Sequence, residues 1–333
     1  MTPSVLLDNG IVPPPTPSAP TLCDLSTSCD PSAREDLPTL CDPTVLSARD
    51  TWTRLAPSLH VCDSAFIHGF DPLCLTNAML EYAAGHMTRE GYFQWPPIDW
   101  DLPLAGMTDI VRRLASMGAP PALAYHYDEF WLMFARLRHL LCALLGDDPA
   151  MLPEFWAWHV DPAQQEAGWG PHRDKGRDSL LDDGRPKAIT LWLPLTEATP
   201  LNGCMYIVPA DRDPTYGTAL ESQHRFDLAD IRALPAQAGA VLGWDQAVLH
   251  WGSHAAARHA PPRISIACEF QRRDVAPFNE PLMDPRGPPD FATRQVLIGR
   301  QMLRYQHMVR AGADWEACAD RMARGTADRT SGP

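Results

Sequence analysis

The chain has 333 residues, 45% of them hydrophobic, which is enough for one large domain with extensions. Its 41 acidic and 28 basic residues give a formal net charge of −13, which argues against nucleic acid as a partner because phosphate binding needs a basic face. No apolar run reaches the roughly 18 residues of a membrane span. The start of the chain lacks the pattern of a secretory signal, and nine scattered cysteines without a Cys-x-x-Cys pair fit a reducing compartment. We therefore expect a cytoplasmic protein.

Residues 1–55 differ in composition from the rest of the chain. Ten prolines fall within residues 1–60, and no aromatic residue precedes Trp52. The pentapeptide Pro-Thr-Leu-Cys-Asp occurs twice, at 20–24 and 38–42. A segment of this composition buries too little apolar surface to offset the entropy lost on ordering. We predict a flexible arm over residues 1–55.

Residues 60–150 carry a helical pattern. Asp71-Pro72 is typical of an N-cap followed by proline at the first helical position, and predicts a helix over 73–86. A strongly apolar stretch predicts a second helix over 126–145, ended by Gly146. We expect these helices to brace one face of a β core.

Strand patterns dominate residues 151–275. An alternating apolar run at 188–195 predicts one strand, and Asn202-Gly203 is a strong hairpin signal. Apolar runs at 239–244 and 263–270 predict two more strands. The sequence therefore predicts a mainly β fold with flanking helices, organised as a double-stranded β-helix (jelly-roll) core with an open mouth.

One short motif within this block has the residue types of a metal site. His172 and Asp174 are separated by one residue, and His250 follows near a later strand. Residues i and i+2 of an extended strand point to the same side, so the first two could share one ion. Two imidazoles and one carboxylate form the ligand set of non-haem Fe(II) oxygenases. In a chain with 12 histidines the motif also arises by chance, so it does not establish a site alone.

Around this motif, residues 155–272 resemble the phytanoyl-CoA dioxygenase family of Fe(II)/2-oxoglutarate oxygenases. That family has a Trp-bearing strand after His-x-Asp, a Thr-Pro-x-Asn-Gly turn with a strand ending in proline, the distal histidine, and an arginine opening the last strand. The residues at those places are Trp192, Asn202, Gly203, Pro209, His250 and Arg263. Two departures concern the substrate side: Ala210-Asp211-Arg212 replaces the frequent Gly-Ser-His, and Gly252 replaces a frequent Ser or Thr.

The resemblance implies an Fe(II) site with 2-oxoglutarate and O₂ as co-substrates, and three protein ligands: His172, Asp174 and His250. A guanidinium is a bidentate partner for a carboxylate, so Arg263 is the candidate clamp for the 5-carboxylate of 2-oxoglutarate. Ser265 faces the same side as Arg263 and could add a hydrogen bond to the co-substrate. Arg258 is a competing candidate for the clamp.

We therefore expect an Fe(II)- and 2-oxoglutarate-dependent dioxygenase that hydroxylates a small molecule or biosynthetic intermediate, releasing succinate and CO₂. Asp174 favours hydroxylation or another oxidation over halide transfer, because related halide-transferring enzymes lack this carboxylate. The alternative is a non-catalytic jelly-roll protein that binds a metal or another ligand. The sequence identifies neither the substrate nor the oligomeric state, and leaves open whether three tryptophans line the pocket: Trp169, Trp244 and Trp251.

We predict three parts along the chain: a flexible arm at 1–55, a dioxygenase domain at 56–290 with helices at 60–150 and the jelly-roll core at 151–275, and a C-terminal helical extension at 291–333. Four arginines of the extension are expected on its wet face: Arg294, Arg300, Arg304 and Arg310. Five basic residues after His172 alternate with acids, so we expect a solvated loop, although some of the five could face an anionic substrate: Arg173, Lys175, Arg177, Arg185 and Lys187.

Overall fold

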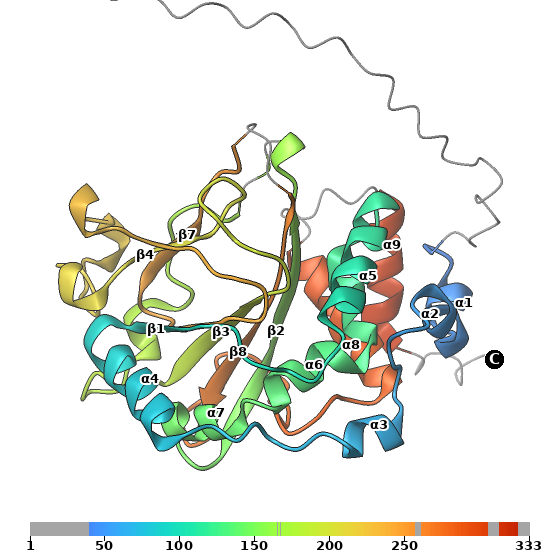
Figure 1. Cartoon of the computed structure of the whole chain (residues 1–333), viewed down its shortest axis with the longest axis horizontal. Helices are drawn as coiled ribbons and strands as arrows, with labels where there is room; N and C mark the ends of the chain where they lie inside the picture. Colours follow the sequence, from blue (N-terminus) through green and yellow to red (C-terminus); the bar gives the residue numbers. More distant parts are fainter. Residues whose placement is uncertain (1–39, 165, 167, 257–260, 306–312, 326–333) are drawn as a thin grey trace, which may run out of the picture. The chain divides into compact units, whose positions relative to one another are not determined.

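A computed structural model describes residues 40–164, 166, 168–256, 261–305 and 313–325. These residues form a β core with most of the helices packed along one side (Figure 1). The predictions for the arm up to residue 39, for Arg258 and for Arg310 lie outside the described residues. Within the described part of the chain, no helix is both long and apolar enough to cross a bilayer.

Two antiparallel sheets form the β core. The larger has the strand order β1-β6-β3-β8-β2, and the smaller has the order β5-β4-β7. The strands are β1 (Tyr92–Trp95), β2 (Pro149–Val160), β3 (Ala188–Pro194), β4 (Met205–Val208), β5 (Arg232–Leu234), β6 (Val241–Asp245), β7 (Leu249–Gly252) and β8 (Arg263–Arg272). The predicted class, mainly β with flanking helices on a jelly-roll core, is confirmed.

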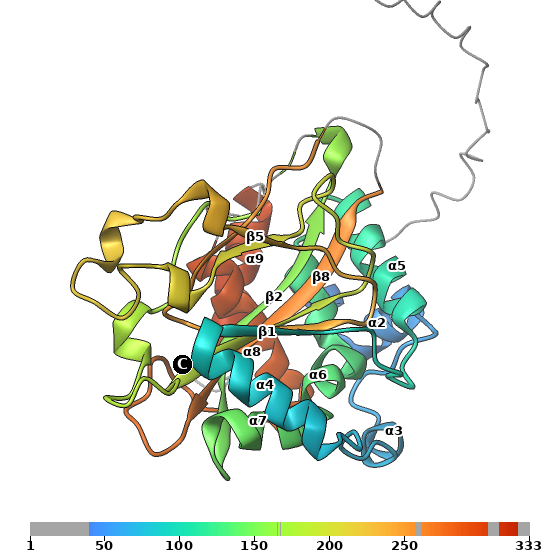
Figure 2. The ribbon, with the colours of Figure 1, turned by 60° about the vertical axis from the view of Figure 1, so that its left-hand side comes forward.

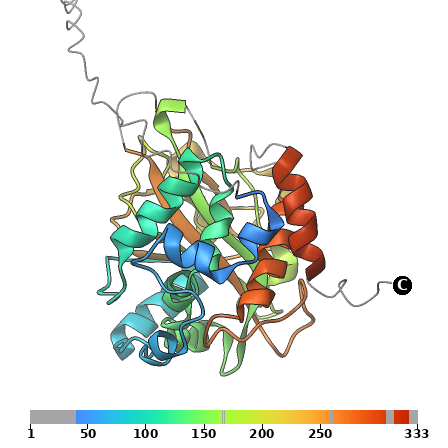
Figure 3. The ribbon, with the colours of Figure 1, turned by 90° about the vertical axis from the view of Figure 1, so that its right-hand side faces the viewer.

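The helices of the described residues are α1 (Pro43–Leu46), α2 (Arg49–Leu55), α3 (Ser64–His68), α4 (Asn77–Glu90), α5 (Leu104–Ser116), α6 (Asp128–Ala135), α7 (Arg138–Leu145), α8 (Phe291–Arg304) and α9 (Ala313–Arg324). Figures 2 and 3 show α2, α5, α6, α8 and α9 on the side of the larger sheet where β2 and β8 lie. The main hydrophobic core lies between these helices and that sheet.

The alternation of β8 determines which side chains reach the inside of the core. Ile264 and Ile266 belong to the main hydrophobic cluster under the helices, as do Cys268 and Phe270. Successive side chains of a strand point to opposite faces, so Arg263 and its i+2 neighbours face the other way. That second face lies between the two sheets, where the candidate site is found.

Part of the predicted arm forms regular structure. Residues 40–55 include α1 and α2, and Leu46, Trp52 and Leu55 are buried. Trp52 stacks on His126 with ring centroids 3.8 Å apart and donates from Nε1 to the carbonyl of Leu46 at 2.9 Å. The prediction of a flexible arm to residue 55 is therefore wrong for residues 40–55, because a few large apolar side chains dock this segment despite its prolines.

Three predicted elements differ in their boundaries. The helix expected after Asp71-Pro72 starts later, as α4, where the Thr76 hydroxyl caps the backbone N–H of Met79. The helix expected over 126–145 is divided into α6 and α7, and the second ends before Gly146 as predicted. The Asn202-Gly203 turn exists, with φ of 90° at Gly203, but β3 and β4 belong to different sheets, so the turn does not close a hairpin.

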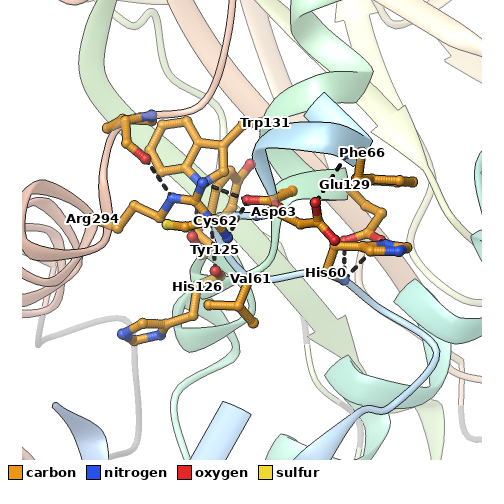
Figure 4. A network of polar contacts seen from close by, with 12 residues as sticks. His60, Val61, Cys62, Asp63, Phe66, Tyr125, His126, Glu129, Trp131 and Arg294 are labelled. Carbon is orange, nitrogen blue, oxygen red and sulfur yellow. Dashed lines mark hydrogen bonds and ion pairs between the residues drawn. The ribbon is translucent and has the colours of Figure 1, made fainter. Parts of the chain in front are cut away.

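A buried polar network joins α8 to α6 and to the segment 60–63 (Figure 4). Arg294 donates to Asp128 Oδ1 at 2.5 Å, and both side chains are 0% exposed. Asp128 also accepts the backbone N–H groups of Cys62 and Asp63, each at 2.9 Å. The prediction that Arg294 lies on the wet face is wrong, because a carboxylate from α6 compensates its charge inside the protein.

Candidate metal centre

His172, Asp174 and His250 lie together between the two sheets. One potential ligand atom from each residue lies within 4.8 Å of the other two. His172 Nε2 is 3.4 Å from Asp174 Oδ1, and His250 Nε2 is 3.6 Å from the same oxygen. This spacing suits a single divalent ion held by two imidazoles and one carboxylate.

Backbone pairing brings these distant segments together. His172 and His250 exchange N–H to carbonyl hydrogen bonds, both 3.0 Å long, and form an isolated antiparallel bridge. His250 is part of β7, which pairs with β4 in the smaller sheet. Asp174 follows on an irregular segment whose next residue, Lys175, donates its N–H to the carbonyl of Gln246. The sequence predicts an extended strand for the first two ligands. In the structure, this segment instead forms a single β-bridge at His172.

Both imidazoles are oriented by main-chain carbonyls. His172 Nδ1 lies 2.7 Å from the carbonyl oxygen of Gly170, and His250 Nδ1 lies 3.1 Å from that of Val248. A carbonyl only accepts hydrogen bonds, so Nδ1 carries the proton in each ring and Nε2 offers its lone pair toward Asp174. Burial lowers the pKa of His250 to about 4, so this ring is neutral near pH 7. Such fixed tautomers are typical of metal-binding histidines.

Asp174 is oriented by two side chains that contact only one of its oxygens. Its Oδ2 accepts hydrogen bonds from Thr190 Oγ1 at 2.7 Å and from Trp244 Nε1 at 3.1 Å. Its Oδ1 faces the two imidazoles. Burial raises the pKa of Asp174, but His250, His172 and the Thr190 hydroxyl lower it by more, so the pKa lies well below its usual range. The carboxylate is therefore ionised, with one oxygen directed to the ligand position.

Arg263 borders the same pocket as the three candidate ligands. Its side chain is 2% exposed, its Nη1 donates to Ser265 Oγ at 2.8 Å, and its guanidinium lies 5.5 Å from the ring centre of Trp192. Burial lowers the pKa of Arg263 to about 10, so the group stays protonated at pH 7. Among the described residues, its Nε has no hydrogen-bond partner. A buried cation with an unused N–H suits the carboxylate of a bound ligand.

Tryptophans form much of the pocket wall. Trp169 and Trp244 line the pocket, and the ring centre of Trp169 is 5.0 Å from that of His172. Trp251 is not among the lining residues; it stacks on Tyr206 instead. The sequence interpretation missed two further lining residues, Trp156 and Trp158, because it did not predict strand β2, which carries both.

Arg173 and Lys175 are held in ion pairs inside the protein, which corrects the expectation of a solvated or substrate-facing loop for these two residues. Arg177 and Arg185 are exposed, as expected for a solvated loop. Arg173 donates from Nη2 to Asp213 Oδ2 at 2.6 Å and from Nη1 to the carbonyl of Ala247 at 2.6 Å. Its side chain is 5% exposed. Lys175 pairs with Glu269. Arg173 thus connects the His172–Asp174 segment to the residues that lead into His250.

We expect Arg173→Gln to weaken divalent-metal binding by about 10- to 100-fold, the usual cost of losing a residue that orients metal ligands. The substitution removes the hydrogen bond to Ala247 that connects the two ligand-bearing segments, together with the ion pair to Asp213, while leaving all three ligands in place. Isothermal titration with Co(II) would measure the effect on variants of unchanged melting temperature. Arg185→Gln is the control, since Arg185 follows in the same segment but is exposed and pairs with Asp183 at the surface. Equal affinities in the two variants would contradict the prediction.

Residues 123–260 match the family model described as Phytanoyl-CoA dioxygenase (PhyH). This match confirms, for residues 123–260, the resemblance seen in the sequence. The matched residues include His172, Asp174 and His250 and end shortly before Arg263. No curated protein sequence matches the chain.

The chain also shows some likeness to several solved structures. The non-haem α-ketoglutarate-dependent epimerase SnoN from nogalamycin biosynthesis is 21% identical, over 59% of this chain and 84% of that one, with a TM-score of 0.43. AviO1 from Streptomyces viridochromogenes Tue57 is 17% identical over 61% and 99%, with a TM-score of 0.46. EctD from S. alaskensis with bound Fe is 19% identical over 70% and 89%, with a TM-score of 0.44.

Proposed function

We propose that the protein is a non-haem Fe(II)- and 2-oxoglutarate-dependent dioxygenase that hydroxylates a small molecule. One observation carries this proposal: a single pocket is lined both by a complete ligand set of two histidines and one carboxylate and by a buried arginine with an unused N–H. An ion held by three protein ligands keeps open positions for a co-substrate. A pocket that only bound a metal would not require the buried cation as well.

In this proposal, His172, Asp174 and His250 hold Fe(II) through Nε2, Oδ1 and Nε2. Arg263 binds the distal carboxylate of 2-oxoglutarate, and Ser265 fixes the guanidinium through its hydroxyl. Bound Fe(II) and 2-oxoglutarate supply the oxidising chemistry, in which O₂ is consumed and the keto acid is converted to succinate and CO₂. The tryptophan walls exclude water from the charged groups around the ion, which strengthens their interactions.

The ligand set favours hydroxylation over halide transfer. Asp174 occupies one of the protein-ligand positions, and its Oδ1 faces both imidazoles. A halide would need the position that this carboxylate takes. The hydrogen bonds from Thr190 and Trp244 hold the carboxylate there.

Anaerobic addition of Fe(II) and 2-oxoglutarate to the purified protein tests the proposal. We expect a visible metal-to-ligand charge-transfer band in the wild-type protein, and its loss in His172→Ala and Asp174→Ala. Each substitution removes a metal ligand, whereas His224→Ala changes an exposed histidine and should leave the band intact. On admission of O₂, the wild-type protein should form succinate in amounts that depend on 2-oxoglutarate.

A folded wild-type protein that gives neither the band nor succinate would contradict the proposal. The alternative, a jelly-roll protein that binds a metal or another ligand without catalysis, would then account for the site. Circular dichroism of every variant separates loss of the band from loss of the fold.

A further inference from the structure

A second and larger cavity adjoins the metal pocket. It has a volume of about 790 Å³ and follows strand β2 from Phe155 into the turn at Asp161. The opposite wall comes from the end of α5, from the 3₁₀ helix η2 (Pro121–His126) and from the end of α8. Trp156 and Trp158 line this cavity and the metal pocket alike. A ligand in the larger cavity would therefore lie beside the metal pocket.

The position of this cavity follows from the sheet. β2 is an edge strand of the larger sheet and pairs only with β8 along residues 155–160. Trp156 lies opposite Ala267 and Trp158 opposite Ser265, so the two indoles stand on the same face as Arg263. The edge of β2 thus separates the helix side of the molecule from the metal pocket, and the cavity lies at this boundary.

Two buried N–H donors at this cavity have no acceptor among the described residues. They are Gln301 Nε2, on a side chain that is only 4% exposed, and Trp156 Nε1. Trp169 Nε1, in the adjoining metal pocket, is a third such donor. A buried N–H without an acceptor costs free energy, and proteins rarely retain one without reason. Acceptor oxygens of a bound molecule would satisfy these donors.

The cavity wall is apolar and aromatic. Trp158, Met302 and Tyr305 lie along it, and Ala119 and Ala122 leave room opposite them. Tyr305 stands 5.6 Å from Trp156 and 5.7 Å from Trp169, measured between ring centres. A wall of flat rings favours a ligand with a flat or cyclic apolar body. The volume falls in the range of pockets that hold drug-sized molecules.

The charges at the rim do not suit a polyanion. Arg112 is exposed and pairs with Asp109. Asp161 and Glu166 add two carboxylates, each already accepting N–H groups within its own turn. Burial lowers the pKa of His159, so this ring is neutral at pH 7. Recognition of a coenzyme A diphosphate needs clustered cations, and the described rim offers none.

We propose that this cavity binds the substrate, and that the substrate is an uncharged, drug-sized ring compound with carbonyl or hydroxyl oxygens rather than a coenzyme A thioester. Gln301 and Trp156 donate hydrogen bonds to those oxygens, while Trp158 and Tyr305 pack against the rings. This inference rests on the proposed function, because it assigns the cavity to the molecule that is oxidised at the neighbouring ion.

The probe for this site is 6-propionyl-2-(dimethylamino)naphthalene, a neutral fused-ring ketone whose fluorescence shifts to the blue in an apolar site. We expect saturable binding to the full-length wild-type protein with blue-shifted emission. Trp156→Phe and Gln301→Leu should each weaken the affinity about 5- to 10-fold, as expected for one lost hydrogen bond. Trp95→Phe is the matched control, because it removes another buried, unpartnered indole N–H that borders neither cavity.

Coenzyme A, added in excess, should not displace the probe. Absence of saturable binding, equal affinities in the wild type and both cavity variants, or displacement by coenzyme A would overturn the inference. The charge-transfer band, recorded on the same preparations, separates the two proposals. A protein that forms the band but does not bind the probe refutes the cavity assignment alone, whereas one that binds the probe without forming the band refutes the oxygenase.

Discussion

Arg263→Ala is expected to raise the dissociation constant for 2-oxoglutarate by about 30-fold or more. Removing one partner of a buried, hydrogen-bonded charge pair costs about 2–5 kcal/mol or more, and each 1.4 kcal/mol is a tenfold change in affinity. Arg263 is buried beside the candidate metal ligands, and its Nε has no partner in the described part of the chain. Without the guanidinium, the distal carboxylate would be buried without a counter-charge.

Titrating the charge-transfer band with 2-oxoglutarate, under anaerobic conditions with Fe(II) in excess, measures this affinity without knowledge of the primary substrate. Arg263→Lys should lose less than Arg263→Ala, because it keeps the charge but not the planar fork. Ser265→Ala should cost about 2- to 10-fold, since it removes one neutral acceptor that holds the guanidinium.

Arg272→Ala is the control for the Arg263 series. Arg272 lies on the same strand but pairs with Asp274 at the surface end of β8, so its loss should leave the 2-oxoglutarate affinity unchanged. An Arg263→Ala protein that binds 2-oxoglutarate as tightly as wild type would remove Arg263 from the site. The clamp would then have to come from another cation.

The site residues that could be found from sequence are those whose position depends on local rules. His172 and Asp174 stand two residues apart, and Arg263 and Ser265 share one face of a strand, so short spacing predicts each pair. In the structure, His172, Asp174 and Arg263 line one pocket together with His250, and Ser265 lies behind Arg263 as the acceptor of its hydrogen bond. The His172–Asp174 pair meets the Arg263–Ser265 pair because β3, β6 and β8 are paired in one sheet. The family resemblance implied this arrangement, and the spacing of the residues alone did not.

The site residues that were missed depend on long-range contacts. The sequence leaves open whether Trp244 lines the pocket and gives no sign of its partner; only the fold brings its indole to Asp174, 70 residues away. Arg173 reads as one charge in a mixed run, and its buried partner Asp213 is 40 residues distant. Trp156 lies on an edge strand whose register with β8 no local pattern encodes. Such residues need the tertiary structure.

The same reason explains the errors in the fold prediction. Proline content correctly marks residues that disfavour regular structure, but it does not reveal that Trp52 finds a stacking partner in His126. The helical pattern predicts an exposed position for Arg294, because arginine is rarely buried unless it has a partner and the sequence shows no partner nearby. Its partner, Asp128, comes from a helix 166 residues earlier in the chain.

Asp128→Ala is expected to lower the free energy of unfolding by about 3–5 kcal/mol, the usual cost of leaving a buried charge without its counter-ion. The variant would leave the guanidinium of Arg294 buried against main-chain carbonyls alone (Figure 4). It would also remove the acceptor of two backbone N–H groups, at Cys62 and Asp63. Urea unfolding followed by circular dichroism measures the change.

Asp320→Ala is the matched control for this pair, because Asp320 and Arg324 form an ion pair whose side chains are 47% and 59% exposed. Exposed pairs contribute about 0–1 kcal/mol, so this variant should unfold near the wild-type midpoint. The double variant Asp128→Ala/Arg294→Met should lose less stability than the sum of its two single variants, since the uncompensated charge is then absent. If Asp128→Ala were no less stable than Asp320→Ala, the network would not be what holds α8 against α6, and the apolar contacts of Leu297 and Ile298 would have to do so.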